Sequence, residues 1–267
     1  MDKKNKLRNF LEKCIIKANS ISFFNKKIVP YLLCLDIGFF ATILLSYCLM
    51  LHFDSEKAAY FVFSYIIIYL LYELIYQKIK AKLLHVYSRS YLQDIILFII
   101  PCFIIFFKLS GVVYSLGFDV IGLIFPLIMT FVRIGCFLGG CCYGIVHSNG
   151  VHYPDFIFKA HRGKCRNFSP GKTPPHRVLP IQLYEATFHF LCFITLSFYF
   201  YIYHVTGNIL FMYLMVYSGF RFCSDFYRTE SVRPRIGIFS EAQVFSMVVF
   251  MVSVLILIVK HYDLFHL

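Results

Sequence analysis

Residues 118–138 read FDVIGLIFPLIMTFVRIGCFL, an almost continuous apolar run broken by one aspartate and one arginine. A helix that crosses a lipid bilayer needs about 20 mostly apolar residues, which is the length of this stretch. The composition of the chain agrees, because 59% of its 267 residues are hydrophobic and only 15% are charged. Soluble domains average about 45–50% apolar and about 25% charged residues. The composition therefore excludes an ordinary cytosolic enzyme and a disordered chain, and it predicts a polytopic membrane protein.

Six further segments have a similar apolar composition. We predict an all-α, polytopic transmembrane helix bundle of about seven spans, with six and eight spans as the alternatives. A polar stretch at 139–180 is too long for a simple connector, so we expect a structured polar loop between spans four and five. The predicted spans are 28–51, 58–75, 95–113, 118–138, 183–203, 209–222 and 242–259.

The first 27 residues differ from the rest because they combine eight Lys and Arg residues with an apolar stripe. The stripe recurs at close to helical spacing, at Leu7, Leu11, Cys14, Ile15 and Ala18. Such a pattern is typical of a basic amphipathic helix that lies on a membrane surface, and a frayed basic tail is the alternative. We therefore divide the chain into an interfacial segment, 1–27, and a single transmembrane domain, 28–267.

The formal charge of +12 comes mainly from the segments between the predicted spans. This distribution favours contacts with membrane lipids that carry anionic headgroups, and it gives no indication of a nucleic-acid partner. With seven spans, 22 of the 26 Lys and Arg residues fall in 1–27, 76–94, 139–182 and 221–241, all on one side of the membrane. The positive-inside rule places that side in the cytoplasm.

Charged residues inside a predicted span are expensive in lipid and therefore indicate functional positions. Four residues qualify, namely Asp36, Glu73, Arg133 and Glu185. Arg133 ends an apolar run and directly precedes a glycine-rich stretch that reaches Gly144. Glycines let the backbone approach a ligand closely, and a guanidinium group pairs bidentately with phosphate. The pattern predicts a phosphate-binding corner at membrane depth, and an arginine that extends to the membrane interface is the alternative.

Two further stretches place polar groups near the same level of the bundle. Arg221 and Arg228 are two helical turns apart, so both guanidinium groups can share one face, with interfacial anchoring as the alternative. The fifth span opens with an amide, a phenol and a carboxylate, on Gln182, Tyr184 and Glu185. These groups either cap the helix or contact a lipid headgroup.

Three cysteines follow Arg133 closely and raise the question of a metal site. Their spacing lacks the usual C-x₂₋₄-C pattern, because Cys136 and Cys141 are five residues apart and Cys142 is adjacent. We therefore assign no metal site and favour helix packing, with a nucleophilic cysteine near Arg133 as the alternative. The other residues considered as ligands are His147, His152, His161 and Cys165.

Several of these stretches resemble the motifs of one family. Residues 133–144, RIGCFLGGCCYG, resemble the signature R-[IL]-G-N-F-x-x-G-E-x-x-G of prolipoprotein diacylglyceryl transferases, and Asp119 and Pro126 fit the same helix. Residues 180–185 are similar to the family's H-P-S-Q-L-Y-E block, and 221–228 to its R-x-x-x-E-F-F-R block. Residues 240–246 are similar to the S-x-G-Q-x-L-S block that opens the last span. The four blocks keep the family's order.

The resemblance implies a seven-span enzyme of the bacterial inner membrane that needs no cofactor. Such an enzyme moves the diacylglyceryl group of phosphatidylglycerol to the lipobox cysteine thiol of a prolipoprotein and releases glycerol phosphate. By resemblance, Arg133 and Arg221 are catalytic, and the substrate-binding residues are Arg133, Gly140, Gly144, Gln182, Tyr184, Glu185, Arg221 and Arg228. The alternatives are a divergent paralogue with another acceptor and a non-catalytic phospholipid-binding membrane protein.

Three departures from the family pattern matter. The signature asparagine and glutamate are replaced by Cys136 and Cys141. The histidine of the family's H-G-G motif has no counterpart, and Asp94 or His85 is the candidate substitute for a base. The family's signature faces the extracytoplasmic side, opposite to the side that the charge count predicts. We favour the interpretation that the basic loops bind headgroups, with action on the opposite leaflet as the alternative.

Overall fold

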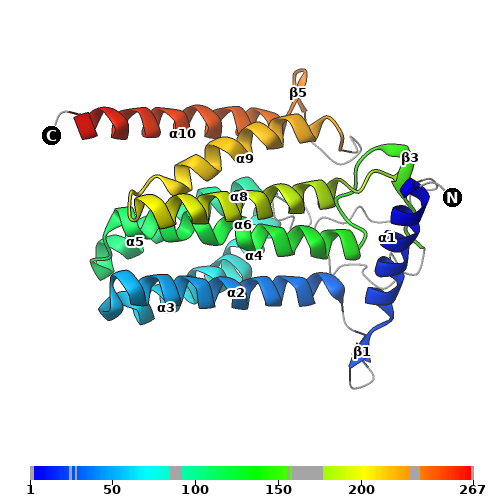
Figure 1. Ribbon diagram of the computed structural model, residues 1–267, viewed down its shortest axis with the longest axis horizontal. Coiled ribbons are helices and arrows are strands. Elements are labelled where there is room, and N and C mark those ends of the chain that lie inside the picture. The colour runs from blue at the N-terminus through cyan, green and yellow to red at the C-terminus, as the bar shows by residue number, and fades with distance from the viewer. Residues whose placement is uncertain are drawn as a thin grey trace.

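The computed structural model describes residues 3–23, 26–27, 29–84, 92–154, 157, 177–228 and 235–265. The described part is predominantly helical, and most helices lie side by side along the long axis of the molecule (Figure 1). This arrangement confirms the predicted all-α membrane bundle. Helix α1 (Lys3–Ser20) lies across one end of that bundle, close to the short strand β3 (Val146–Val151).

Each of the seven predicted spans falls on a helix. Five helical segments in the described part are long and apolar enough to cross a membrane, whereas the apolar part of α5 and the helix α9 are shorter. The number of seven crossings therefore stays a prediction. The helices are α2 (Pro30–Phe53), α3 (Ser55–Leu71) with its continuations η1 (Tyr72–Tyr76) and α4 (Gln77–Leu84), α5 (Leu92–Ser110), α6 (Tyr114–Leu138), α8 (Ile181–Tyr203), α9 (Ile209–Asp225) and α10 (Glu241–Phe265).

The predicted boundary between the third and fourth spans is wrong by several residues. Helix α5 ends at Ser110 instead of position 113, because Gly111 adopts a φ of 68° that breaks the helix. Helix α6 then begins at Tyr114, four residues before the predicted start. The connection is therefore a tight turn.

Helix α6 is the central element of the bundle. In its most apolar window 72% of the residues are buried, compared with 17% in α2 and in α10. It contacts α2, α8 and α9, while α10 packs on α9. Large apolar side chains remain exposed on the outward faces of the helices, as expected for surfaces that contact lipid acyl chains. The site residues that α6 carries are therefore held between several helices.

Helix α1 is fixed to the bundle by specific contacts. Ile15 is fully buried, and the Asn19 side chain donates a hydrogen bond of 2.8 Å to the carbonyl of Leu138 at the end of α6. The backbone N–H of His152 donates to the carboxylate of Glu12 at 3.0 Å. The predicted N-terminal helix is confirmed, and its location on a membrane surface stays a prediction.

The polar loop after α6 is ordered where the structure describes it. Strand β3 forms bridges to Val178, and both Tyr153 and Ile157 are fully buried. Two small hairpins lie elsewhere, β1 (Ser22–Phe23) with β2 (Lys26–Lys27) and β4 (Arg235–Ile236) with β5 (Phe239–Ser240). Of the ligands considered for a metal, His161 and Cys165 lie outside the described residues, as does His85.

Candidate functional site

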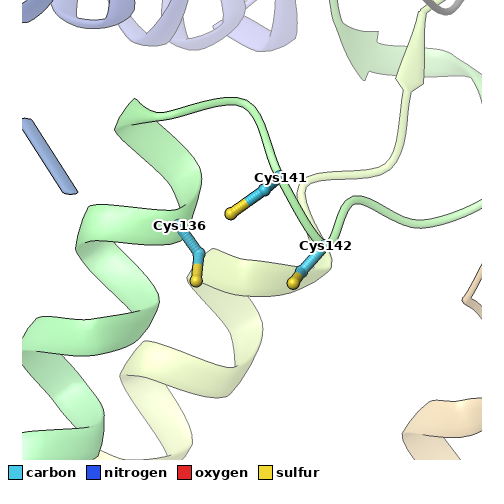
Figure 2. A group of neighbouring side chains, drawn as sticks. All are labelled: Cys136, Cys141 and Cys142. Carbon is cyan, nitrogen blue, oxygen red and sulfur yellow. The ribbon is translucent and has the colours of Figure 1, made fainter. Parts of the chain in front are cut away.

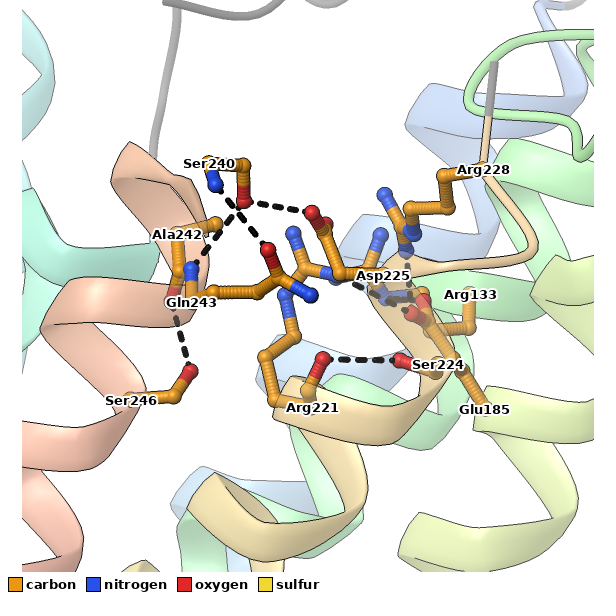
Figure 3. A network of polar contacts seen from close by, with 10 residues as sticks. All are labelled: Arg133, Glu185, Arg221, Ser224, Asp225, Arg228, Ser240, Ala242, Gln243 and Ser246. Carbon is orange, nitrogen blue, oxygen red and sulfur yellow. Dashed lines mark hydrogen bonds and ion pairs between the residues drawn. The ribbon is translucent and has the colours of Figure 1, made fainter. Parts of the chain in front are cut away.

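Glu185 is the centre of a buried ion-pair cluster at the end of the bundle near α1. Its carboxylate is fully buried, and its Oε2 lies 2.8 Å from Nε of Arg133. Nη2 of Arg228 contacts Oε1 of the same carboxylate, and Nη1 of Arg221 lies 4.0 Å from that oxygen. Three guanidinium groups from different parts of the chain thus converge on one carboxylate (Figure 3).

The local helices favour this distribution of charge. Arg133 lies near the carboxyl end of α6, Arg221 lies in the last turns of α9, and Arg228 follows α9 directly. Glu185 lies near the amino end of α8. Cations are stabilised at helix carboxyl ends and anions at helix amino ends, so each charge complements the dipole of its own helix. The ends of three helices therefore assemble the cluster.

A second carboxylate connects the cluster to α10. Oδ1 of Asp225 forms an ion pair with Nη1 of Arg221 at 3.1 Å, and its Oδ2 accepts a hydrogen bond from the hydroxyl of Ser240 at 2.5 Å. Ser240 precedes α10, and it forms a reciprocal capping box with Gln243, with bonds of 2.9 and 3.1 Å. The start of α10 is thereby fixed beside the arginines, as Figure 3 shows.

The cluster carries an excess of positive charge and of hydrogen-bond donors. Among the described residues, three guanidinium groups face two carboxylates, Glu185 and Asp225, which leaves one positive charge. Nε of Arg133 and Nη1 of Arg221 are buried and face carboxylate oxygens at 2.8 and 3.1 Å, but neither makes a well-oriented hydrogen bond to an acceptor in the described part of the chain. Nε of Arg228 is buried without a hydrogen-bond partner there. Buried donors are nearly always paired in proteins, so this arrangement suits an anionic ligand.

The glycine-rich stretch after Arg133 forms a Schellman motif. Gly140 adopts a φ of 68°, and its N–H donates to the carbonyl of Phe137 at 3.3 Å. The N–H of Cys141 donates to the carbonyl of Cys136 at 3.1 Å. These two bonds end α6 and reverse the chain, which only a residue tolerant of positive φ at position 140 allows without strain.

Gly144 lies where two site-bearing segments meet. Its N–H donates to the carbonyl of Leu179 at 2.9 Å, and a Cβ at this position would lie 2.6 Å from the carbonyl oxygen of Tyr227. A side chain would push apart the start of α8 and the segment that carries Arg228. Gly140 thus allows the chain to reverse after α6, and Gly144 allows the start of α8 to approach the segment that carries Arg228.

The three residues that open α8 have different environments. The Gln182 side chain is fully buried and donates to the carbonyl of Cys141 at 2.6 Å, which ties α8 to the turn after α6. Glu185 holds the arginines. Tyr184 is 54% exposed, so its ring lies on the outer face of α8 instead of among the buried charges. Neighbouring residues on a helix point about 100° apart, which accounts for this separation.

The sequence matches the prolipoprotein diacylglyceryl transferase family over residues 21–259. The chain belongs to this family. A relative named phosphatidylglycerol–prolipoprotein diacylglyceryl transferase 2, from Clostridium perfringens (strain 13 / Type A), is 29% identical over 126 residues. That alignment covers 47% of this chain and 44% of the relative. Family membership and the long apolar helices make the chain a multi-pass membrane protein.

Within this transferase family, the position of the base is the main question for this chain. Asp94 lies in the first turn of α5, and its side chain lies outside the described residues. His189, which belongs to none of the motifs described above, is fully buried one turn after Glu185. Its Nδ1 lies 3.1 Å from the hydroxyl of Tyr213, and its ring packs 4.8 Å from that of Tyr217. The feature of the sequence that could have indicated His189 is its spacing of four residues from Glu185, which places both side chains on one face of α8.

The three cysteines in the family signature region also come together. Their sulfur atoms lie within 4.8 Å of one another, and the side chains point toward a common space (Figure 2). Cys142 adopts a φ of 59°, an unusual conformation for a residue with a side chain. Hydrogen bonds from the Cys136 and Cys141 thiols hold the pKa of Cys142 well below its usual range, and the charges of Arg228 and Arg133 act in the same direction. His147 and His152 are exposed and do not join this group.

Proposed function

We propose that this chain transfers the diacylglyceryl group of phosphatidylglycerol to a cysteine thiol of a prolipoprotein in the bacterial inner membrane. The observation that carries the proposal is the buried cluster of Arg133, Arg221 and Arg228, which has one excess positive charge and unpaired donors when the described residues are counted. The headgroup of phosphatidylglycerol carries one negative phosphodiester charge, which would balance that excess. Family membership supports the same class of reaction.

The reaction requires charge stabilisation at the phosphate. The acceptor thiolate attacks the diacylglyceryl carbon next to the phosphate ester, a C–S bond forms, and the C–O bond breaks. The electron pair leaves with glycerol phosphate, so negative charge develops on the phosphate oxygens. Fixed guanidinium donors at that position stabilise the transition state without reorganisation. Arg133 and Arg221 have the donors for this role, while Arg228 binds the headgroup beside them.

The other residues support the phosphate site. Glu185 keeps the three guanidinium groups at a fixed spacing despite their mutual repulsion. Gln182, Gly140 and Gly144 hold the surrounding backbone, and Tyr184 faces the region where acyl chains of a bound lipid would lie. Asp94 is the proposed base from the sequence.

A reconstituted assay tests the proposal directly. The purified chain in phosphatidylglycerol vesicles is incubated with a peptide that contains one lipobox cysteine. We expect a thioether-linked diacylglyceryl peptide and one equivalent of glycerol phosphate, and no product with the matched serine peptide. Absence of both products under conditions in which a transferase of the same family is active would contradict the proposal.

A second candidate is a phospholipid-binding protein without transferase activity, or a paralogue that uses another acceptor. The replacement of the signature asparagine and glutamate by Cys136 and Cys141 favours it, because two polar contacts are lost. Complementation of a strain depleted of its own transferase separates the two candidates. Rescue that depends on Arg133 supports the enzyme. Phosphatidylglycerol binding without rescue supports the second candidate.

A further inference from the structure

The three cysteine sulfurs lie close enough together to form a metal site after small changes of rotamer. The Sγ atoms of Cys136, Cys141 and Cys142 all lie within 4.8 Å of one another (Figure 2). A tetrahedral zinc ion with Zn–S bonds of about 2.3 Å separates its sulfur ligands by about 3.8 Å. A small contraction of rotamers would therefore bring all three sulfurs to coordination distance. Soft thiolate ligands of this kind select zinc and copper over magnesium or calcium.

The backbone holds these cysteines in place without any ligand. The Schellman turn bonds the N–H of Cys141 to the carbonyl of Cys136, and Gln182 holds the carbonyl of Cys141. Cys142 is kept at positive φ, a conformation that is unfavourable for a residue with a Cβ and that is often retained at functional sites. This turn also explains why the C-x₂₋₄-C spacing rule failed to indicate the cluster, since Cys136 and Cys141 meet through a hydrogen-bonded reversal.

The three cysteines differ in burial, and the Cys142 side of the cluster is open to a further ligand. Cys136 and Cys141 are 2% and 1% exposed, whereas Cys142 is only half-buried. Cys136 lies three residues after Arg133 on α6, so the two side chains are neighbours on one face of the helix. The cluster thus adjoins the proposed phosphate site. Catalytic zinc sites characteristically have three protein ligands and a fourth position for a substrate.

We propose that Cys136, Cys141 and Cys142 bind one Zn²⁺ ion, whose fourth coordination position takes the acceptor thiol. This inference rests on the proposed transferase function. A thiol that coordinates zinc is deprotonated outright, whereas a free thiol with a pKa of about 8.5 is mostly protonated at neutral pH. By this route the acceptor releases its proton to water and needs no protein base such as Asp94, and its sulfur then forms the C–S bond as the C–O bond to phosphate breaks. The electron pair leaves with glycerol phosphate, and nothing is oxidised or reduced.

Metal binding is tested first, without reference to turnover. The full chain is purified in detergent, and its zinc content and its titration with Co²⁺ are measured, with helicity by circular dichroism as the folding check. We expect one metal ion per chain and the near-ultraviolet absorption of cobalt–thiolate bonds. Both are lost in Cys136→Ser and Cys142→Ser and retained in the matched controls Cys48→Ser and Cys102→Ser, whose thiols lie elsewhere in the bundle. Equal metal content in all folded variants would overturn the inference.

The fourth position is tested with the cobalt-loaded chain and the acceptor peptide. The cysteine peptide should change the cobalt–thiolate spectrum, and the serine peptide should leave it unchanged. If neither peptide changes the spectrum, the role of the fourth position is contradicted. A thiol-dependent change without transfer from phosphatidylglycerol would support the metal site and refute the proposed function. Full transfer by metal-free protein would support the proposed function and overturn the inference.

Discussion

The two ends of helix α6 contain buried charges that serve different purposes. Near the start of the helix, Asp119 accepts three backbone hydrogen bonds, from Thr206 and Gly207 at 2.7 Å each and from Ile209 at 3.0 Å. Near its end, roughly 21 Å away at 1.5 Å per residue, Arg133 joins the cluster around Glu185.

The difference lies in how completely the charges are paired. At the Asp119 end, three donors surround one carboxylate, and Lys260 donates to the carbonyls of Thr206 and Gly207 at 3.1 and 2.8 Å. At the Arg133 end, donors outnumber acceptors among the described residues. A site such as that of Asp119, in which the carboxylate is fully hydrogen-bonded, stabilises the connection between helices. A site with surplus buried donors retains binding capacity for an anion, and the following predictions test this distinction.

The largest effect is expected for Glu185→Ala. The substitution leaves three guanidinium groups buried without their shared carboxylate, and breaking a buried ion pair destabilises a protein by about 3–5 kcal/mol. Unfolding in mixed micelles, followed by circular dichroism, measures the change. Thr187→Ala, on the exposed face of the same helix, is the control. If both variants unfold alike, the cluster contributes no stability.

Arg133→Ala is expected to reduce the rate of transfer by about 10²–10³-fold, the usual loss on removing one transition-state donor. Arg133→Lys should restore part of the rate, because it keeps the charge but not the bidentate geometry. Single-turnover release of glycerol phosphate is the measurement. Lys260→Gln removes a cation at the opposite end of α6 and should retain the rate. A similar loss in both variants would show that position along α6 is irrelevant.

Asp119→Ala should lower stability by about 1–3 kcal/mol, because the three backbone N–H groups lose their acceptor. The rate per folded molecule should be unchanged, since this end of α6 has no surplus donors for a substrate. Thermal unfolding and the transfer assay are run on the same preparation. A loss of activity greater than the loss of folded protein would refute the structural role of Asp119.

The smallest effect is expected for Ser240→Ala, which removes the capping bond from the backbone N–H of Gln243 and the bond to Asp225. The stability should fall by about 1 kcal/mol, the usual contribution of an N-cap. Ser240→Thr keeps a hydroxyl and should behave as wild type, and Ser246→Ala serves as a second hydroxyl deletion on the same helix. If Ser240→Thr is as destabilised as Ser240→Ala, the cap is not the cause.

The helices could be predicted from the sequence because each apolar run is long and bounded by polar residues. All seven predicted segments fall on helices, and the boundary error near Gly111 arises from a single positive φ. Helical segments depend on local composition and helical spacing, which a sequence displays directly. The expectation that Arg133, Arg221 and Arg228 belong to one site came instead from the resemblance of three separate stretches to the motifs of one family.

Contacts between residues that are far apart in the sequence could not be predicted in the same way. Glu185 was selected as a polar residue at the mouth of the bundle, yet its role as the shared carboxylate depends on three distant segments. His189 lies in an apolar helix and had no motif to indicate it. The three cysteines meet through a Schellman turn, which spacing rules for metal ligands do not include.

The most direct test of the account is lipid retention measured by native mass spectrometry. Wild type, Asp119→Ala and Arg133→Ala are equilibrated with phosphatidylglycerol and, in parallel, with diacylglycerol that has the same acyl chains but no phosphate. Wild type and Asp119→Ala should each retain one phosphatidylglycerol. Arg133→Ala should retain it at least about tenfold more weakly, since a hydrogen bond to a charged group contributes about 1.5–3 kcal/mol. Equal retention by all three proteins, or equal retention of the two lipids, would contradict this expectation.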